Sequence, residues 1–105
     1  EVISIVDKFL EHPRVYQFTN AGIQKIYISS ADFMTRNIEN RVEVATPIYD
    51  PYLQRQIMDV FDIIWSDNVK ARMLNGSSQN TFVNNKKNTI RSQFEIYEYY
   101  KKEFT

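Results

Sequence analysis

The feature that most constrains this sequence is a pair of β-forming runs joined by a short turn. The runs RVYQF and KIYISS are rich in β-branched and aromatic residues, and TNAGIQ separates them. Asparagine and glycine supply the backbone conformations that a turn requires, so the pattern predicts a β-hairpin. Any fold proposed for the chain must therefore include a sheet.

Two further elements are expected directly after the hairpin. RVEVATPI alternates well enough to predict a third strand that ends at Pro47. Asp50 and Pro51 then supply an N-cap and a first-turn proline, and an apolar stripe continues to about Trp65. This stripe predicts a helix whose apolar face is formed by Leu53, Ile57, Val60, Phe61 and Ile64.

The two ends of the chain also carry helical patterns. Near the start, apolar residues recur at helical spacing until HPR, where Pro13 disfavours helix at the preceding residue, so a first helix is expected to end near Glu11 or His12. Near the end, VKARML predicts a fourth strand and NGSSQNTFVNNKKN a polar loop. Thr89 is expected to cap a last helix that turns Ile90, Phe94 and Tyr97 inward. The element order predicts an α+β fold.

Composition limits the function classes. At 105 residues, the chain is long enough for one modest core. It has no cysteine and one histidine, and its acidic residues lack an EF-hand spacing, so no metal site is predicted. Its longest apolar runs fall far short of the roughly 20 residues that span a bilayer. No secretion signal is visible, and a chain that starts at Glu1 is expected to be a piece of a longer protein.

Basic residues are unevenly distributed although the net charge is zero. Residues 69–91 carry a charge of +5 without an acidic residue, which suits either a solvated loop or a surface that faces an anion. A second group, Arg14, Arg36 and Arg41, brackets the hairpin. Arginine grips phosphate oxygens in bidentate fashion, and the nearby SSAD and TRN add hydroxyl and amide groups. This second group is a candidate phosphate site.

Three stretches of the chain resemble a known family. VDKFLEHPRVYQF, YISSADFMTRNIENRVEVATPIYDPYLQ and VKARML are similar, in this order, to the C-terminal end of the larger, histidine-phosphorylated family of bacterial polyphosphate kinases. The resemblance implies that residues 1–105 are the C-terminal part of the second of two phospholipase D-like domains. Such a half domain would have a small, mainly antiparallel or mixed sheet packed with about three helices.

The resemblance also implies a reaction. In this family, ATP passes its terminal phosphate reversibly to a histidine upstream, and the phosphohistidine passes it to polyphosphate. ATP would be a substrate, and the magnesium ligands and phosphorylated histidine would lie outside this chain. The other expected partners are ADP, polyphosphate, the remaining domains and, at full length, further copies of the protein, with no specific nucleic acid and no transmembrane segment. The expected location is the cytoplasm, with or without peripheral attachment to the inner membrane.

The resemblance also implies roles for particular residues, according to their positions in the matching stretches. His12 matches a family histidine that lines the ATP site and is expected to act as an acid or base, and Arg41 matches an arginine near the nucleotide phosphates. Imidazole suits this role because both of its protonation states exist near neutral pH. Weaker phosphate-binding candidates, chosen by their proximity in sequence, are Arg14, Ser29, Ser30 and Arg36.

Each of these roles has an alternative. His12 could cap the first helix, and Arg41 could pair with Glu39 or Glu43. The tyrosines at 97, 99 and 100 could stack on an adenine or belong to the core. For the whole chain, the alternatives are half of a phospholipase D-like phosphodiesterase, with HPR and SSAD as a degenerate motif, and a non-enzymatic module that binds a polyanion through residues 69–91.

Overall fold

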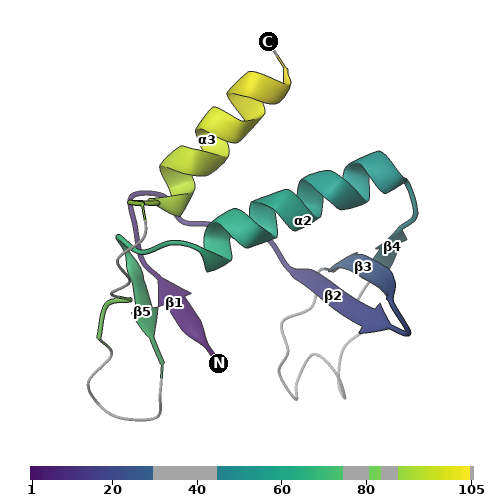
Figure 1. Ribbon diagram of the computed structural model, residues 1–105, viewed down its shortest axis with the longest axis horizontal. Coiled ribbons are helices and arrows are strands. Elements are labelled where there is room, and N and C mark those ends of the chain that lie inside the picture. Colours follow the sequence, from purple (N-terminus) through teal and green to yellow (C-terminus); the bar gives the residue numbers. More distant parts are fainter. Residues whose placement is uncertain (30–44, 75–80, 84–87, 105) are drawn as a thin grey trace. The chain divides into compact units, whose positions relative to one another are not determined.

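The computed structural model describes residues 1–29, 45–74, 81–83 and 88–104 (Figure 1). The chain forms two compact units, one comprising Glu1–Leu10 with Ile57–Thr105 and the other Glu11–Gln56. We call them the split unit and the hairpin unit, and describe each by itself. The described residues contain two helices and antiparallel strands, which confirms the predicted α+β class.

The hairpin unit contains a three-stranded antiparallel sheet in the order β2-β3-β4. Strands β2 (Val15–Asn20) and β3 (Ile23–Ser29) are joined by Ala21 and Gly22, whose φ angles are 51° and 81°. Two successive residues with positive φ are what a two-residue hairpin turn of type I′ requires. The predicted hairpin is thus confirmed.

Strand β4 (Ala45–Ile48) completes this sheet by pairing with β3. It confirms the second half of the third predicted strand, which ends at Ile48, one residue beyond the predicted Pro47, whereas residues 41–44 lie outside the described part of the chain. Ile48 pairs with Ile26, which is 1% exposed and forms the core of the unit. The face of the sheet that carries Ile26 is therefore buried.

Helix α2 (Pro51–Trp65) begins as the sequence predicts. The Asp50 carboxylate accepts hydrogen bonds from the backbone N–H groups of Tyr52 and Leu53, at 2.8 and 3.3 Å. These are two of the N–H groups that a helix start leaves without partners, and a capping aspartate satisfies them. The Gln54 amide donates to the carbonyl oxygen of Ile48 at 2.6 Å, which ties the first turn to β4.

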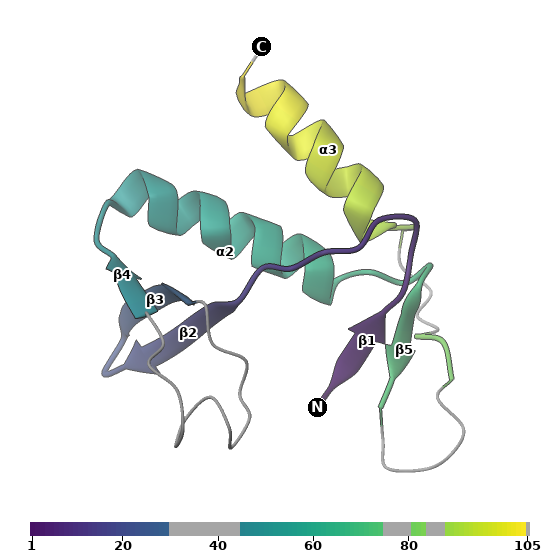
Figure 2. The same cartoon turned by 180° about the vertical axis from the view of Figure 1, so that it is seen from behind.

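The split unit contains a strand where a helix was predicted. Strand β1 (Ile3–Ile5) pairs antiparallel with β5 (Ala71–Met73), side by side in Figures 1 and 2. The first helix was therefore wrong, whereas the VKARML strand is confirmed. The helical spacing misled because its β-branched residues also suit a strand, and because β5, the strand that decides the matter, lies far away in sequence. Leu10, one of the apolar residues that recur at helical spacing near the start of the chain, is 96% exposed.

Helix α3 (Ser92–Glu103) starts later than predicted, and Thr89 does not cap it. The residue before the helix is Arg91, which makes no side-chain cap of its own. Phe94 and Tyr97, expected to point inward, are 45% and 65% exposed, so that prediction was wrong for the described chain. The helix instead buries Ser92 and Gln93 at its start.

Candidate functional site

His12 lies in an extended segment that leads directly into β2. Since no helix precedes it, the alternative of a helix cap was wrong. Pro13 restricts the backbone on both sides of its own nitrogen, which favours an extended chain here. Next to it, the carbonyl oxygen of Arg14 accepts a hydrogen bond from the backbone N–H of Ser29 at 2.9 Å, so the hairpin fixes the end of the segment.

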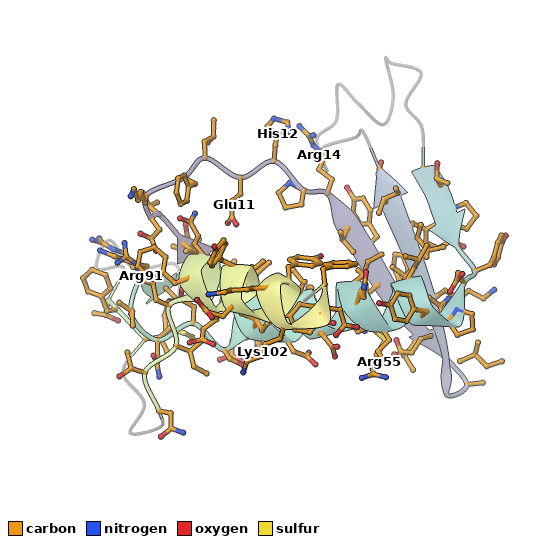
Figure 3. The ribbon with its side chains drawn as sticks, turned by 90° about the horizontal axis from the view of Figure 1, so that it is seen from above. Glu11, His12, Arg14, Arg55, Arg91 and Lys102 are labelled. Carbon is orange, nitrogen blue, oxygen red and sulfur yellow. The ribbon has the colours of Figure 1, made fainter. Side chains whose placement is uncertain are left out.

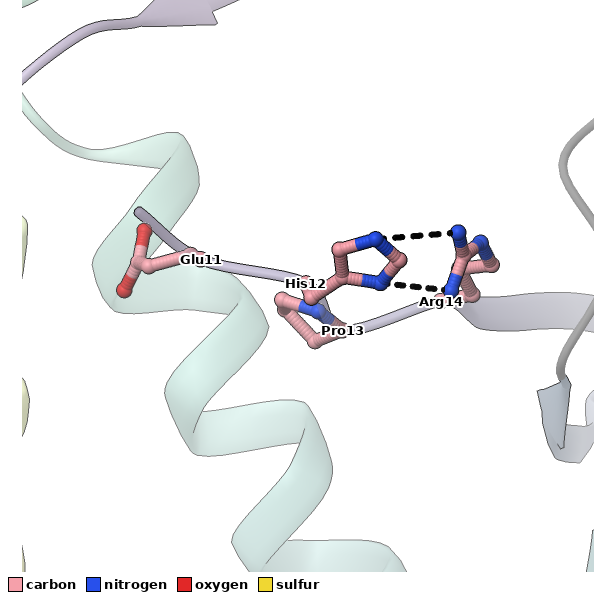
Figure 4. A pocket seen from close by; sticks show the side chains of 4 residues that line it. All are labelled: Glu11, His12, Pro13 and Arg14. Carbon is pink, nitrogen blue, oxygen red and sulfur yellow. Dashed lines mark hydrogen bonds between the residues drawn. The ribbon is translucent and has the colours of Figure 1, made fainter. Parts of the chain in front are cut away.

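The side chains of His12 and Arg14 meet on one side of this segment, and Glu11 points to the other side (Figure 3). One guanidinium nitrogen lies 2.7 Å from Nδ1 of His12, and the other lies 3.3 Å from Nε2 (Figure 4). A guanidinium can only donate, so an imidazole nitrogen that bonds to it must accept. A neutral imidazole accepts at one nitrogen only, so at most one of the two contacts is a hydrogen bond, and the tautomer of the ring decides which.

A shallow hollow of about 210 Å³ surrounds this pair. It is lined by Glu11, His12, Pro13 and Arg14. Sites for whole small molecules enclose roughly 300–1,000 Å³. The hollow therefore suits one small group, such as a phosphate, while the rest of a nucleotide would contact other residues.

The structure brings together three of the predicted site residues. His12 and Arg14 touch through their side chains, and Ser29 is joined to Arg14 through the backbone. Ser30, Arg36 and Arg41 lie outside the described residues, so their predicted roles stay predictions.

Two arginines of the basic segment 69–91 contact protein groups. Arg91 donates to both carboxylate oxygens of Asp7, at 2.6 and 2.8 Å, and its guanidinium lies 4.0 Å from the ring centre of Phe94. Arg72 lies over the ring of Phe82 at 4.3 Å. The hydrogen bonds from Arg91 lower the pKa of Asp7 to about 2, and Asp7 raises the pKa of Arg91. These contacts favour a structural role over anion binding for both arginines.

Asp67 is a residue that the sequence prediction missed. Its fully buried carboxylate accepts hydrogen bonds at 2.8–3.0 Å from the backbone N–H groups of four residues, namely Val69, Lys70, Ala71 and Ser92. Burial alone raises the pKa of Asp67, but the hydrogen bonds, led by the one from Ser92, outweigh it and leave the pKa below its ordinary 3.8. Asp67 therefore stays ionised and holds the start of α3 against β5.

The tyrosines near the C-terminus fall into two groups. The hydroxyl of Tyr99 donates to the Asp59 carboxylate at 2.8 Å, so this side chain packs within the split unit. Tyr97 and Tyr100 are exposed at 65% and 39%. Stacking on an adenine stays an untested alternative for these two.

Among the residues that the structure describes, metal ligands are sparse around His12. The hollow offers one carboxylate, that of Glu11, beside a guanidinium. Mg²⁺ prefers carboxylate, phosphate and water oxygens, so this group of side chains does not suit it. Elsewhere in the described ranges, no three histidine, aspartate or glutamate side chains gather closely enough to hold a metal ion.

An α+β chain with a histidine and an arginine side by side at a small surface hollow has the side chains that phosphate-binding modules use. Comparison with known proteins identifies the family. Residues 1–93 match the model of the family "Polyphosphate kinase C-terminal domain 2", and the chain belongs to this family.

The individual relatives agree with this assignment. The chain is 52% identical to a polyphosphate kinase from Klebsiella pneumoniae over 101 residues, which are 95% of this chain and 15% of that protein. It is also 52% identical to one from Vibrio parahaemolyticus over 103 residues, 95% of this chain and 14% of the relative. A crystal structure of polyphosphate kinase from Porphyromonas gingivalis superposes with a TM-score of 0.91 at 41% identity, covering 96% of this chain and 16% of that one.

The chain thus spans about a seventh of the length of these relatives. In the described part of the chain, neither helix has the length and apolar character needed to cross a membrane.

Proposed function

We propose that this chain is the C-terminal part of a polyphosphate kinase, in which it supplies His12 as a proton-transfer group. The whole enzyme would move the terminal phosphate of ATP to polyphosphate, reversibly, through a phosphohistidine on a domain outside this chain. The observation that carries the proposal is the contact between His12 and Arg14 in a chain of the polyphosphate kinase family.

The chemistry follows from the two side chains. Phosphoryl transfer leaves negative charge on the departing oxygen, and a correctly placed acid lowers the barrier by protonating it. As the imidazolium, His12 would give a proton to that oxygen and become neutral, and in the reverse reaction the neutral ring would take the proton back. The guanidinium of Arg14 would meanwhile hold a phosphate oxygen, because its planar set of N–H donors suits phosphate.

The remaining assignments complete the proposal. Arg41 would stabilise charge on the transferring phosphate, and Ser29, Ser30 and Arg36 would contribute further hydrogen bonds to it. Magnesium would be held by residues outside this chain, and no step of His12 depends on it. The enzyme would act in the cytoplasm, as an assembly of several copies, on ATP, ADP and polyphosphate.

The experiment is a chimera in which this chain replaces the matching 101 residues of the Klebsiella relative. The chimera should make polyphosphate from ATP, and His12→Ala within it should lower kcat by roughly 10²–10⁴-fold, the usual contribution of a general acid or base. Lys25→Gln is the control, because Lys25 is exposed on β3 of the same unit and does not line the hollow at His12.

Two results would count against the proposal. Wild-type turnover by the His12→Ala chimera would remove the acid-base role. Polyphosphate synthesis by the purified 105-residue chain alone would show that the phosphorylated group is inside it.

A further inference from the structure

The start of helix α3 holds the segment of chain that leads from β1 towards His12 (Figures 1 and 2). The side chain of Gln93 accepts a hydrogen bond from the backbone N–H of Phe9 at 3.0 Å and donates one to the carbonyl oxygen of Phe9 at 2.8 Å. Nearby, Arg91 donates to both carboxylate oxygens of Asp7. These residues belong to the split unit, and we call their contacts the clamp.

The two contacts with Phe9 need an amide side chain. A backbone N–H requires an acceptor and a backbone carbonyl requires a donor, and the amide of glutamine carries one of each side by side. The partners also fix the orientation of the amide, because the reverse orientation would set donor against donor and acceptor against acceptor. Gln93 is 9% exposed, whereas Phe9 is 58% exposed. A buried side chain therefore holds the backbone of an exposed residue.

The part of the chain that carries the clamp is itself fixed. Ser92 lies between the two clamping side chains, and its backbone N–H donates to the buried Asp67 carboxylate at 2.8 Å. Arg91, Ser92 and Gln93 thus each bond to a distant part of the split unit. The Asp7 side chain is 1% exposed, so the segment is also held farther upstream. The start of α3 is therefore a firm support for this segment.

His12 follows the clamp closely along the chain. It lies three residues after Phe9. On its other side, the carbonyl oxygen of Arg14 accepts a hydrogen bond from the last residue of β3 at 2.9 Å. Residues 10–13 thus form a short stretch between two hydrogen-bonded backbone positions, and Pro13 restricts it further. If the contacts with Phe9 are lost, the stretch that carries His12 becomes longer and freer.

We propose that Gln93 is a positioning residue for His12, and that it acts by holding the backbone of Phe9. The inference rests on the proposed function, because the effect of Gln93 passes through proton transfer by His12. An acid or base must lie within hydrogen-bond reach of the atom that it protonates, and a misplacement of about 1 Å can lower a rate by about 100-fold. Gln93 would act through the backbone and not by contact with the substrate.

Gln93→Met separates this role from a purely structural one. Methionine has an unbranched side chain of similar length but cannot form the two hydrogen bonds with Phe9. Because Phe9 is exposed, water can bond to its backbone groups in place of the amide. We therefore expect the variant to stay folded while the backbone around His12 moves more.

Nuclear magnetic resonance of the 105-residue chain measures this motion without reference to activity. The backbone amide order parameters of Glu11 and His12 should fall from about 0.85, the value of a rigid backbone, to below about 0.6 in Gln93→Met. Tyr99→Phe is the matched control, because it removes a hydrogen bond from the same helix to Asp59 and leaves the clamp intact. A wild-type segment that is already flexible, or a Gln93→Met segment that stays rigid, would overturn the clamp.

The chimera described above tests the consequence for phosphate transfer. Gln93→Met should lower kcat by about 10–100-fold, while KM for ATP changes by less than about threefold, because the variant displaces a group that acts in the chemical step. In a His12→Ala background, Gln93→Met should have almost no further effect, since an absent imidazole cannot be misplaced. Tyr99→Phe should keep the wild-type kcat.

Gln93→Glu is the second variant, in case Gln93→Met folds poorly. It keeps the size and shape of glutamine, but an ionised carboxylate has no donor for the carbonyl oxygen of Phe9. Its kcat should therefore also fall when His12 is present and change little when His12 is replaced by alanine. Urea denaturation of each variant shows how much of any loss comes from unfolding.

The outcomes separate this inference from the proposed function. Wild-type turnover by the His12→Ala chimera would overturn both. If His12→Ala lowers kcat as proposed, folded Gln93 variants that keep the wild-type kcat would overturn the role of Gln93 alone. A loss by the same factor with and without the imidazole would do so too, because it would show that Gln93 does not act through His12.

Discussion

The contacts that stabilise the split unit join residues farther apart in the sequence than those that stabilise the hairpin unit. In the split unit, Asp67 bonds to Ser92 across 25 residues of sequence, and Asp7 bonds to Arg91 across 84. In the hairpin unit, the turn at Ala21 and Gly22 and the cap at Asp50 join near neighbours. The split unit thus relies on polar side-chain contacts between distant segments, whereas in the hairpin unit the β2–β3 turn and the helix cap are local and the β3–β4 pairing joins residues 16 to 22 apart.

The same contrast separates a structural site from a candidate functional one. Asp67 is buried and accepts from four backbone N–H groups, so neither its position nor its charge can change without breaking contacts. His12 is exposed and, among the described residues, bonds to the side chain of Arg14, so it is placed to meet a ligand. A substitution of Asp67 should therefore unfold the chain, whereas a substitution of His12 should leave it folded.

Asp67→Ala should break the split unit and have the largest effect. It leaves four buried backbone N–H groups without an acceptor, and unsatisfied groups of this kind cost about 1–3 kcal/mol each before the structure relaxes. We expect the free energy of unfolding to fall by about 3–5 kcal/mol, the range of the most damaging single substitutions. Urea denaturation followed by circular dichroism measures it. Asp62→Ala, at an exposed aspartate in α2, is the control, and equal losses in both variants would contradict the role of Asp67.

Lowering the pH should weaken the same unit without a mutation. The folded-state pKa is about 2 for Asp7 and below 3.8 for Asp67. A lowered pKa stabilises the folded chain above the unfolded value of 3.8, and this contribution is lost as the pH falls through the folded value. The midpoint of urea denaturation should therefore drop between pH 4 and pH 2. Asp7→Asn should flatten this decline, and an unchanged slope would show that the Asp7–Arg91 pair does not contribute.

The two units also differ in how far their sequences predicted them. Asp50 and Pro51 lie next to the helix they start, and the turn lies between the strands it joins, so local patterns were sufficient. Thr89 was the wrong cap because the acceptor for Ser92 comes from Asp67, far from it in sequence. Likewise, the pattern from Val2 to Leu10 could not reveal that β5 would pair with its first residues. For the candidate site, the family resemblance pointed to His12, whereas its contact with Arg14 required coordinates.

A substitution at the hairpin turn should change stability by less, and upward. Ala21 has a φ of 51°, a left-handed conformation that costs a residue with a Cβ about 1–2 kcal/mol. Ala21→Asn creates the Asn-Gly pair that type I′ turns favour, and we expect a gain of about 0.5–1 kcal/mol in the free energy of unfolding. Gly22→Ala is the opposite control, because its φ of 81° is strained for alanine although the space around it is open. If Ala21→Asn were also destabilised, the positive φ of residue 21 would not be what limits the stability of this turn.

His12→Ala should have the smallest effect on stability and so sharpens the comparison most. The side chain is exposed, and its contact with Arg14 lies at the surface, where substitutions usually change the free energy of unfolding by no more than about 0.5 kcal/mol. Urea denaturation of the 105-residue chain should thus be indistinguishable from wild type, whereas the same change in the chimera should greatly reduce phosphate transfer. Arg14→Ala is the companion variant. It removes the guanidinium that contacts His12 but keeps the backbone carbonyl that accepts from Ser29. A loss of several kcal/mol for His12→Ala would make this residue a structural one, like Asp67, and any loss of activity would then reflect unfolding.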